Sequence, residues 1–258
     1  MKPILPALAG LLSFVPLHAA VYAHYSFDSG YTDSSGNGRH GTLTDVGTIG
    51  NSGITTSAGS HVFGGGAMNF DAERDYIEVP MGTFSSGSPY TISFWARRAE
   101  GDTGGAAEWD MVIGDRSSTN FFVALNGTTG AGVRWRGAGT AAERQADFTT
   151  TKDFGWHHYA LVASGNAMTL YMDGALVSTD TGNQTGFQWN TIGEAYTTAA
   201  DFDFNGQIDE MWIFDEALDG TAVSNLFQYN STVPEPSCLL LSIAGLGMAF
   251  RRIRPSRA

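Results

Sequence analysis

The sequence predicts an all-β protein, a two-sheet antiparallel β-sandwich of many short strands, on three observations. Residues 20–232 contain 30 of the 33 glycines but only two prolines, Pro80 and Pro89. Glycine at about twice its usual frequency is typical of short strands joined by tight turns. Between the glycines, apolar residues alternate with polar ones, which is the pattern of half-buried strands. The 42% hydrophobic content is enough for a packed core.

The expected elements follow from these patterns in chain order. Three segments alternate with a period of two and predict strands: residues 20–27, 90–96 and 157–163. Further along, Asp173-Gly174 separates two short alternating segments, and Asp-Gly accommodates the positive φ of a two-residue type I′ turn, so residues 168–178 predict a hairpin. Residues 221–228 are expected to form a helical turn. No break in composition occurs before residue 232, which indicates one domain.

The start of the chain has the pattern of a secretory signal peptide. A lysine and an apolar run are followed by the small residues Ala19 and Ala20. We therefore expect residues 1–20 to be removed by cleavage near residues 19–23, and residues 21–231 to form the folded domain.

Residues 233–258 form a second predicted signal. A Pro-Glu-Pro segment precedes thirteen largely apolar residues, and the basic cluster Arg251-Arg-Ile-Arg254 follows. Thirteen helical residues cover about 20 Å, less than the roughly 30 Å of a hydrocarbon core. The segment therefore predicts a removable anchor whose arginines stay on the cytoplasmic side.

The order of these three parts resembles the PEP-CTERM sorting signal of Gram-negative bacteria that make exopolysaccharide. The resemblance implies processing by an exosortase-type membrane protease, with Pro234, Glu235 and Pro236 as the recognition element. It also implies transient membrane anchoring and a final location at the cell surface, outer membrane or extracellular matrix. The alternative is a proline-rich linker with a weak membrane anchor.

The charge of the predicted domain disfavours two classes of partner. The whole chain has a formal net charge of −12, but residues 20–232 carry 9 basic and 25 acidic residues, a net charge of −16. A domain this acidic repels nucleic-acid phosphates and anionic lipid headgroups, which leaves cations and neutral ligands. The single cysteine, Cys238, lies in the tail, so the domain has no disulfide and no cysteine chemistry.

Three blocks of sequence occur in a fixed order along residues 20–230. They are Ala23-His-Tyr-Ser-Phe-Asp28 with the loop from Asp33 to Leu43, Gly65-Gly-Ala-Met-Asn-Phe-Asp71 with Asp75-Tyr-Ile-Glu-Val-Pro80 and Tyr90-Thr-Ile-Ser-Phe-Trp95, and Trp156-His-His-Tyr-Ala-Leu-Val162 with Leu170-Tyr-Met-Asp-Gly174, Asn205-Gly-Gln-Ile-Asp-Glu210 and Asp215-Glu-Ala-Leu218. Together they resemble a laminin-G-like domain of the concanavalin A-like superfamily. The resemblance implies a two-sheet antiparallel jelly roll whose first and last strands pair.

Hard oxygen donors gather in the first and last of these blocks. The carboxylates of Asp28, Asp33 and Asp209 are joined by the carbonyls of the loop from Asp33 to His40, which turns tightly because its glycines and Asn37 accommodate left-handed φ. A hard cation such as Ca²⁺ prefers such oxygens. The resemblance implies a structural calcium site with Asp28 and Asp209 as side-chain ligands and with Asp33, Asn37 and their loop as further donors. The alternative is that Asp28 and Asp33 only cap turns.

The superfamily also includes glucanases, which carry a Glu-x-Asp-x-x-Glu signature on one strand. The nearest segment here runs from Gln207 to Trp212, and these two residues stand in place of the signature's glutamates. An amide is no nucleophile toward an anomeric carbon and an indole is no proton donor, so this segment lacks the two carboxylates that glycoside hydrolysis requires. Gly-x-Ser-x-Gly and His-Glu-x-x-His motifs are absent from the sequence as well.

Other polar residues could suggest chemistry but have simpler interpretations. His157 and His158 are expected to point to opposite faces of one strand, so they do not act on one ligand together. Glu108, Asp110 and Asp115 are interpreted as solvated loop charges, with an acidic sugar-facing patch as the alternative.

Aromatic residues in Gly-, Thr- and Asn-rich surroundings are the candidate platforms for sugar stacking. These candidates are Trp109, Trp135, Phe187, Trp189 and Tyr196. Trp95, Trp156 and Trp212 lie in strand patterns and are expected to pack in the core or between the sheets.

The sequence therefore predicts an exported, non-catalytic binding or scaffolding domain, stabilised by Ca²⁺, that recognises extracellular carbohydrate or a matrix partner. Two alternatives stay open at this point. One is a glycoside-active enzyme of the same superfamily, and the other is a purely structural matrix protein.

Overall fold

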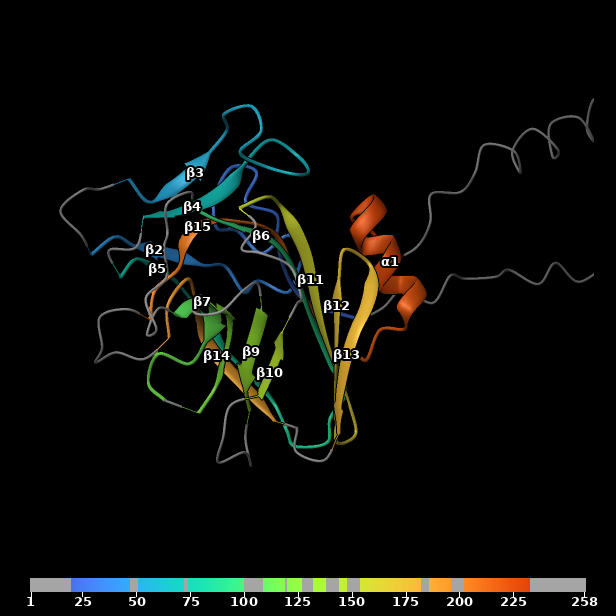
Figure 1. Ribbon diagram of the computed structural model, residues 1–258. Coiled ribbons are helices and arrows are strands. Elements are labelled where there is room, and N and C mark those ends of the chain that lie inside the picture. Colours follow the sequence, from blue (N-terminus) through green and yellow to red (C-terminus); the bar gives the residue numbers. More distant parts are fainter. Residues whose placement is uncertain are drawn as a thin grey trace, which may run out of the picture.

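Two antiparallel sheets form a sandwich in the computed structural model, which describes residues 20–46, 51–71, 74–99, 109–118, 120–126, 132–137, 144–147, 154–181, 186–195 and 202–232 (Figure 1). The larger sheet contains β1 (Val21–Tyr25), β3 (Gly53–Thr55), β4 (Ala67–Asp71), β6 (Tyr90–Arg98), β11 (His157–Ser164), β12 (Ala167–Met172), β13 (Ala175–Thr181) and β15 (Asn205–Phe214). Its order is β13-β12-β11-β6-β15-β4-β3, and β1 pairs with β15. The predicted all-β sandwich is confirmed.

The smaller sheet contains β2 (Thr42–Thr44), β5 (Tyr76–Phe84), β7 (Trp109–Gly114), β8 (Phe122–Asn126), β9 (Gly132–Arg136), β10 (Arg144–Asp147) and β14 (Phe187–Ile192). Its order is β10-β9-β8-β7-β14-β5-β2. The central neighbours β7, β14 and β5 are distant in sequence. Their pairing brings polar residues from three parts of the chain together.

The core lies between the two sheets and is rich in aromatic side chains. Phe94 and Leu161 of the larger sheet and Ile77 and Trp189 of the smaller sheet are each at most 1% exposed. Alternate residues of β6, β8, β9 and β11 enter this core, which is why such strands show a period of two in the sequence. Gly82 leaves room for the indole of Trp189, because a Cβ at this position would lie 2.1 Å from the ring.

Helix α1 (Gly220–Tyr229) covers the outer face of the larger sheet. Asp219 caps its start by accepting a hydrogen bond from the Ala222 amide (2.8 Å), and Asn230, with φ 51°, ends it. Val223 and Leu226 of the helix belong to a small apolar cluster with Phe214 of β15. Figure 1 shows α1 beside β12 and β13, outside the pair of sheets. Within the described residues, no helix has the length and apolarity needed to cross a bilayer.

The predicted hairpin and strands are present. Strands β12 and β13 pair across a turn in which Asp173 has φ 50° and Gly174 has φ 75°. Both values are positive, as a type I′ turn requires. The three alternating segments correspond to β1, β6 and β11, and the predicted helical turn is α1. The first and last strands pair, with Ala23 opposite Ile213.

The loop between β1 and β2 fastens β1 to the sandwich. The side-chain amide of Asn37 donates to the carbonyls of Val21 (2.7 Å) and Tyr22 (3.2 Å). The guanidinium of Arg39 lies 3.7 Å from the centre of the Tyr22 ring. The left-handed backbone of this loop is at Gly36 and Gly38, not at Asn37. The loop therefore acts as a clamp on the first strand.

Candidate functional site

An open pocket of about 190 Å³ lies on the smaller sheet, on the face turned away from the core. Its lining residues come from β5, from the turn after β7 and from β14: Tyr76, Glu78, Arg116, Ser117, Asn190 and Thr191. Tyr76 and Glu78 lie on this outer face because Ile77, between them, enters the core. The pocket thus combines an aromatic ring, a carboxylate, a guanidinium, a hydroxyl and an amide.

Arg116 is held in place from three sides. Its backbone amide donates to Oδ1 of Asn190 (2.8 Å), and its Nε donates to Oε2 of Glu194 (2.5 Å). Its guanidinium carbon lies 4.1 Å from the centre of the Tyr76 ring, within cation–π distance. Within the described part of the chain, the two terminal nitrogens of Arg116 have no hydrogen-bond partner. The Arg116 side chain is 27% exposed at the rim of the pocket.

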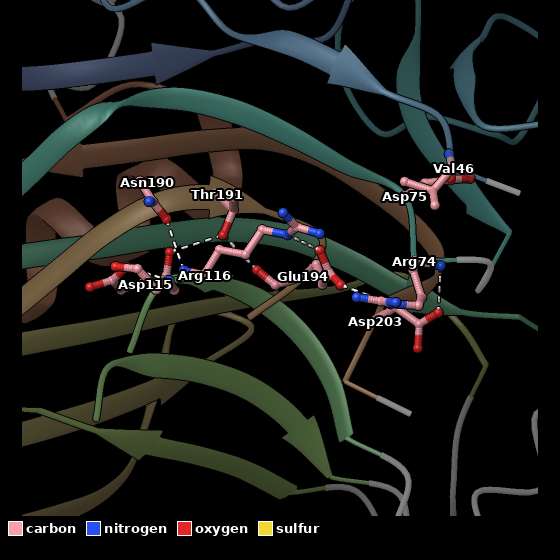
Figure 2. A network of polar contacts seen from close by, with 11 residues as sticks. Val46, Arg74, Asp75, Asp115, Arg116, Asn190, Thr191, Glu194 and Asp203 are labelled. Carbon is pink, nitrogen blue, oxygen red and sulfur yellow. Dashed lines mark hydrogen bonds and ion pairs between the residues drawn. The ribbon is translucent and has the colours of Figure 1, made fainter. Parts of the chain in front are cut away.

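Glu194 is the buried anchor of this arrangement. Its side chain is 1% exposed and accepts from Arg116 and, through Oε1, from Nε of Arg74 (3.3 Å). Figure 2 shows the two arginines approaching Glu194 from opposite sides. A buried carboxylate without cations would be strongly unfavourable, so the two guanidinium groups stabilise it and are oriented by it.

The turn after β7 is fixed by Asp115, which is fully buried. Oδ1 of Asp115 accepts from the backbone amide (2.8 Å) and the hydroxyl (2.6 Å) of Ser117, and Oδ2 accepts from Gln188 (2.6 Å). The rim of the pocket is therefore pre-organised, which reduces the entropy lost when a ligand binds.

The aromatic platforms proposed from the sequence are mostly not available for stacking. Trp135 and Trp189 are 3% and 1% exposed, and both belong to the core, so the expectation that they stack on a sugar is wrong. Phe187 is also in the core, and Tyr196 lies outside the described residues. The large rings on β9 and β14 fill the space between the sheets, which composition alone did not indicate.

Trp109 differs from the other candidates. It is half-buried on the outer face of the smaller sheet, against Phe122 and Phe202, and the guanidinium of Arg134 lies 4.6 Å from its ring centre. Ligand contact by Trp109 therefore stays a prediction. Trp95 packs as expected, but under α1, where its ring stacks on Phe227, not between the sheets.

The predicted calcium ligands fall into two groups. Asp33 and Asn37 are committed to the clamp: Oδ1 of Asp33 accepts from the amides of His24 (3.0 Å) and Ser35 (2.9 Å), and Oδ2 accepts from Arg39 (2.9 Å). These bonds hold the pKa of Asp33 below its ordinary value, although burial opposes them. For Asp33 the turn-capping alternative describes the geometry.

Asp28 and Asp209 both lie against one loop, between β3 and β4. Oδ1 of Asp28 accepts from the Gly65 amide, and Oδ2 of Asp209 accepts from the amides of Val62 (2.7 Å) and Phe63 (3.2 Å). Oδ1 of Asp209 is buried and has no partner in the described residues. The orphaned oxygen is suited to a cation, but no three acidic, histidine or cysteine side chains of the described segments are grouped around one point. Calcium binding stays a prediction, now centred on Asp28 and Asp209.

The two carboxylates in the segment nearest to the glucanase signature are closed to solvent. Asp209 and Glu210 are 0% and 3% exposed, and Oε2 of Glu210 lies 2.6 Å from Nε2 of His24. Neither carboxylate faces the pocket, which lies on the other sheet. This segment therefore supplies no pair of carboxylates to a substrate.

The positions of the remaining polar residues were predicted correctly only in part. His158 contacts Ser93 on the outer face (2.8 Å), whereas His157 contacts Tyr159 on the core side, so the opposite orientation is confirmed. Asp110 and Asp115 are buried, at 3% and 0% exposed, and are not solvated loop charges. Glu108 lies outside the described residues.

The sequence reasoning missed the pocket. Tyr76 and Glu78 stand in an ordinary alternating strand, and Arg116 in a short turn. They are separated by about forty residues in sequence, and only the pairing of β14 between β5 and β7 brings them together. The one available signal was that outward-facing positions of β5 carry a ring and an acid.

Comparisons with known proteins agree with this architecture. Residues 71–224 match the Laminin_G_3 family model, described as the concanavalin A-like lectin/glucanases superfamily. No curated protein sequence matches the chain. Similar solved structures include domain 4 of AbnA, a GH43 extracellular arabinanase from Geobacillus stearothermophilus, in complex with arabinotriose; the TM-score is 0.62 at 24% identity, and the match covers 82% of this chain and all of that domain.

Two binding domains of toxins are also similar. The botulinum neurotoxin serotype G binding domain matches with a TM-score of 0.58 at 17% identity, covering 81% of this chain and 51% of that one. The binding domain of Paraclostridial Mosquitocidal Protein 1 matches with a TM-score of 0.53 at 19% identity, covering 77% and 49%. This chain spans about half the length of these toxin domains. At these identities the likeness shows the fold alone.

Proposed function

Since this chain belongs to the Laminin_G_3 family of the concanavalin A-like lectin/glucanases superfamily, we propose that it is an exported, non-catalytic binding domain for extracellular carbohydrate. Two of the similar solved structures are binding domains of toxins, and a third, domain 4 of an extracellular arabinanase, is in complex with arabinotriose. The observation that carries the proposal is the pocket on the smaller sheet, with Arg116 fixed at its rim.

The pocket has the composition that sugar recognition requires. The Tyr76 ring supplies apolar surface, Arg116 donates hydrogen bonds, and Glu78 accepts them. The net charge of −16 on residues 20–232 disfavours polyanions and leaves neutral glycans as ligands. An open pocket of about 190 Å³ accommodates part of a chain, such as one or two sugar units, better than a buried small molecule.

A glycan array probed with residues 20–232, which contain all the strands and α1, tests the proposal. We expect saturable binding of neutral oligosaccharides, and we expect Arg116→Ala and Tyr76→Ala each to weaken it by about tenfold or more, because tyrosine and arginine carry much of the energy at binding surfaces.

Arg39→Ala is the matched control for these variants. Arg39 also covers a tyrosine ring, that of Tyr22, but it lies in the clamp on β1 and not in the pocket. Melting curves show whether each variant is folded. An array without any bound glycan, or full affinity in Arg116→Ala, would contradict the proposal.

We further propose that Ca²⁺ stabilises the loop between β3 and β4 through Asp28 and Asp209. A chelator is then expected to lower the melting temperature, and added Ca²⁺ to restore it, because an ion that binds only the folded state stabilises that state. Asp28→Asn removes the effect if the proposal is right. A melt that is the same with chelator and with Ca²⁺ would leave these carboxylates as acceptors for backbone amides only.

Export and sorting complete the proposal. The amino-terminal segment directs secretion, and the tail with Pro234, Glu235 and Pro236 serves an exosortase-type protease in a Gram-negative cell. Replacing these three residues with alanine is expected to leave the tail uncleaved in such a host, which the mass of the recovered protein reports. Cleavage of the altered tail at the usual rate would refute this part.

A further inference from the structure

The residue before β1 is bonded to the sandwich through its backbone. The amide nitrogen of Ala20 donates to Oε1 of Glu216 (3.0 Å), and its carbonyl accepts from the amide of Asp215 (3.2 Å). These contacts extend the pairing of β1 with β15 by one residue beyond Val21, which lies opposite Phe214. The ordered fold thus includes Ala20.

Three peptide bonds in this region follow a small residue, as cleavage by a signal peptidase requires. They are the bonds after Ala19, Ala20 and Ala23. The third residue before these bonds is Leu17, His18 and Val21 in turn, so none of the three matches the Ala-x-Ala pattern in full. The three products differ in how much of β1 they keep, and this difference can be read from the structure.

Cleavage after Ala23 would remove more than half of the first strand. Ala23 is 1% exposed and pairs with Ile213 in the core. The ring of Tyr22 packs against Trp189 with centres 5.4 Å apart. Asn37 would lose both of its carbonyl acceptors. This product would leave a gap in the larger sheet.

Cleavage after Ala20 would keep β1 but lose the contacts of Ala20 with Asp215 and Glu216. Cleavage after Ala19 keeps every contact and changes one of them. The amide of Ala20 becomes an α-ammonium group, which is a stronger donor to a carboxylate than a neutral amide. Glu216 already has its Oε1 at this nitrogen.

We propose that the mature protein begins at Ala20, and that its new α-ammonium group forms an ion pair with Glu216. The inference rests on the proposed export of the chain, and it is independent of the ligand. Glu216 then binds the processed end, so that cleavage strengthens a contact that the precursor already makes through the Ala20 amide.

The first test is the amino terminus of the exported protein. The full chain is expressed in a Gram-negative host, and the recovered protein is examined by intact mass and amino-terminal sequencing. A first residue of Ala20 supports the inference, and Val21 or His24 overturns it. A product that still has residues 1–19 overturns both the inference and the proposed export, whereas glycan binding by residues 20–232 is unaffected by any of these outcomes.

The second test separates the ion pair from an ordinary hydrogen bond. Glu216→Gln is compared in two proteins, one that begins at Ala20 and one with a Gly-Ser extension before Ala20. In the first, the substitution is expected to lower the melting temperature by about 1–2 °C, the scale of an exposed ion pair. In the extended protein the change is expected to be smaller.

The pH dependence gives the same comparison a second readout. The difference between the two proteins should vanish above about pH 9, where an α-amino group of ordinary pKa, about 8, is neutral. An equal effect of Glu216→Gln in both proteins, or one that persists at high pH, would show that Glu216 accepts from the backbone without regard to the processed end.

Discussion

Replacing Trp189 with alanine is expected to lower the free energy of unfolding by about 3–5 kcal/mol, which is the usual cost of removing a large buried aromatic ring. The indole is 1% exposed and contacts Tyr22, Phe84 and Phe187, with ring centres 5.1–5.9 Å away. Gly82 has no side chain that could fill the space left behind. For a domain of this size the loss corresponds to a melting temperature lower by about 10 °C.

Urea unfolding followed by tryptophan fluorescence measures this loss, and Trp109→Ala is the control. Trp109 is only half-buried, against Phe122 and Phe202 on the outer face, so its removal should cost much less. Glycan affinity is measured for both variants below their unfolding transitions. If Trp189→Ala left stability unchanged and abolished binding, the placement of this ring in the core would be wrong.

Two buried groups are expected to oppose each other in the pH dependence of stability. Burial raises the pKa of Asp209 to about 7, although hydrogen bonds from Val62 and Phe63 lower it. Burial lowers the pKa of His158 to about 4, although the charge of Asp173 raises it. His158 lies under α1, and Asp209 lies under the loop between β3 and β4; in both places burial makes ionisation cost free energy.

The signs follow from which state holds the proton. Between about pH 4 and 7 folded Asp209 keeps a proton that the unfolded chain has lost, so this group lowers stability as the pH rises. Between about pH 4 and 6.5 the unfolded chain holds a proton that folded His158 lacks, so this group raises stability as the pH rises. Each contributes roughly 2 kcal/mol between pH 5 and 7, and the two largely cancel.

Single variants should show the pH dependence of the unfolding free energy that each group contributes. In calcium-free buffer, Asp209→Asn is expected to be less stable at pH 5 than at pH 7 by roughly 2 kcal/mol, because the contribution of His158 is then no longer offset by that of Asp209. His158→Gln is expected to show the opposite slope, and the double variant neither. Denaturant melts from pH 4.5 to 7.5 measure all four proteins. Parallel curves for both single variants and the original protein would contradict the buried environment of these groups.

The fold was predictable because its signals are local. Alternation marked β1, β6 and β11, Asp173-Gly174 marked a hairpin, and residues 221–228 marked the helix. The pocket was not predictable, because Tyr76, Arg116 and Asn190 meet only through the order of strands in the smaller sheet.

The aromatic residues show a second limit of the sequence. Polar, glycine-rich neighbours suggested that Trp135 and Trp189 were exposed, but strand alternation places a residue inside or outside regardless of the neighbours that flank its strand. For Asp33, in the loop after β1, the residue type and its neighbours likewise did not reveal what the side chain contacts. The carboxylate of Asp33 is of the type that binds cations, but its oxygens accept hydrogen bonds from three backbone amides instead.

Both ends of the folded segment are bonded to residues at or just after the end of β15, which allows the chain to be connected differently. Ala20 is bonded to Asp215, and Asn230 accepts from the indole of Trp212 (2.8 Å). The two ends are therefore close, and a short peptide from residue 232 to residue 20 would close the backbone into a ring. Such a circular permutant, reopened at the Gly165 turn between β11 and β12, should keep the same sandwich, because the described strands all stay intact and only a turn is opened.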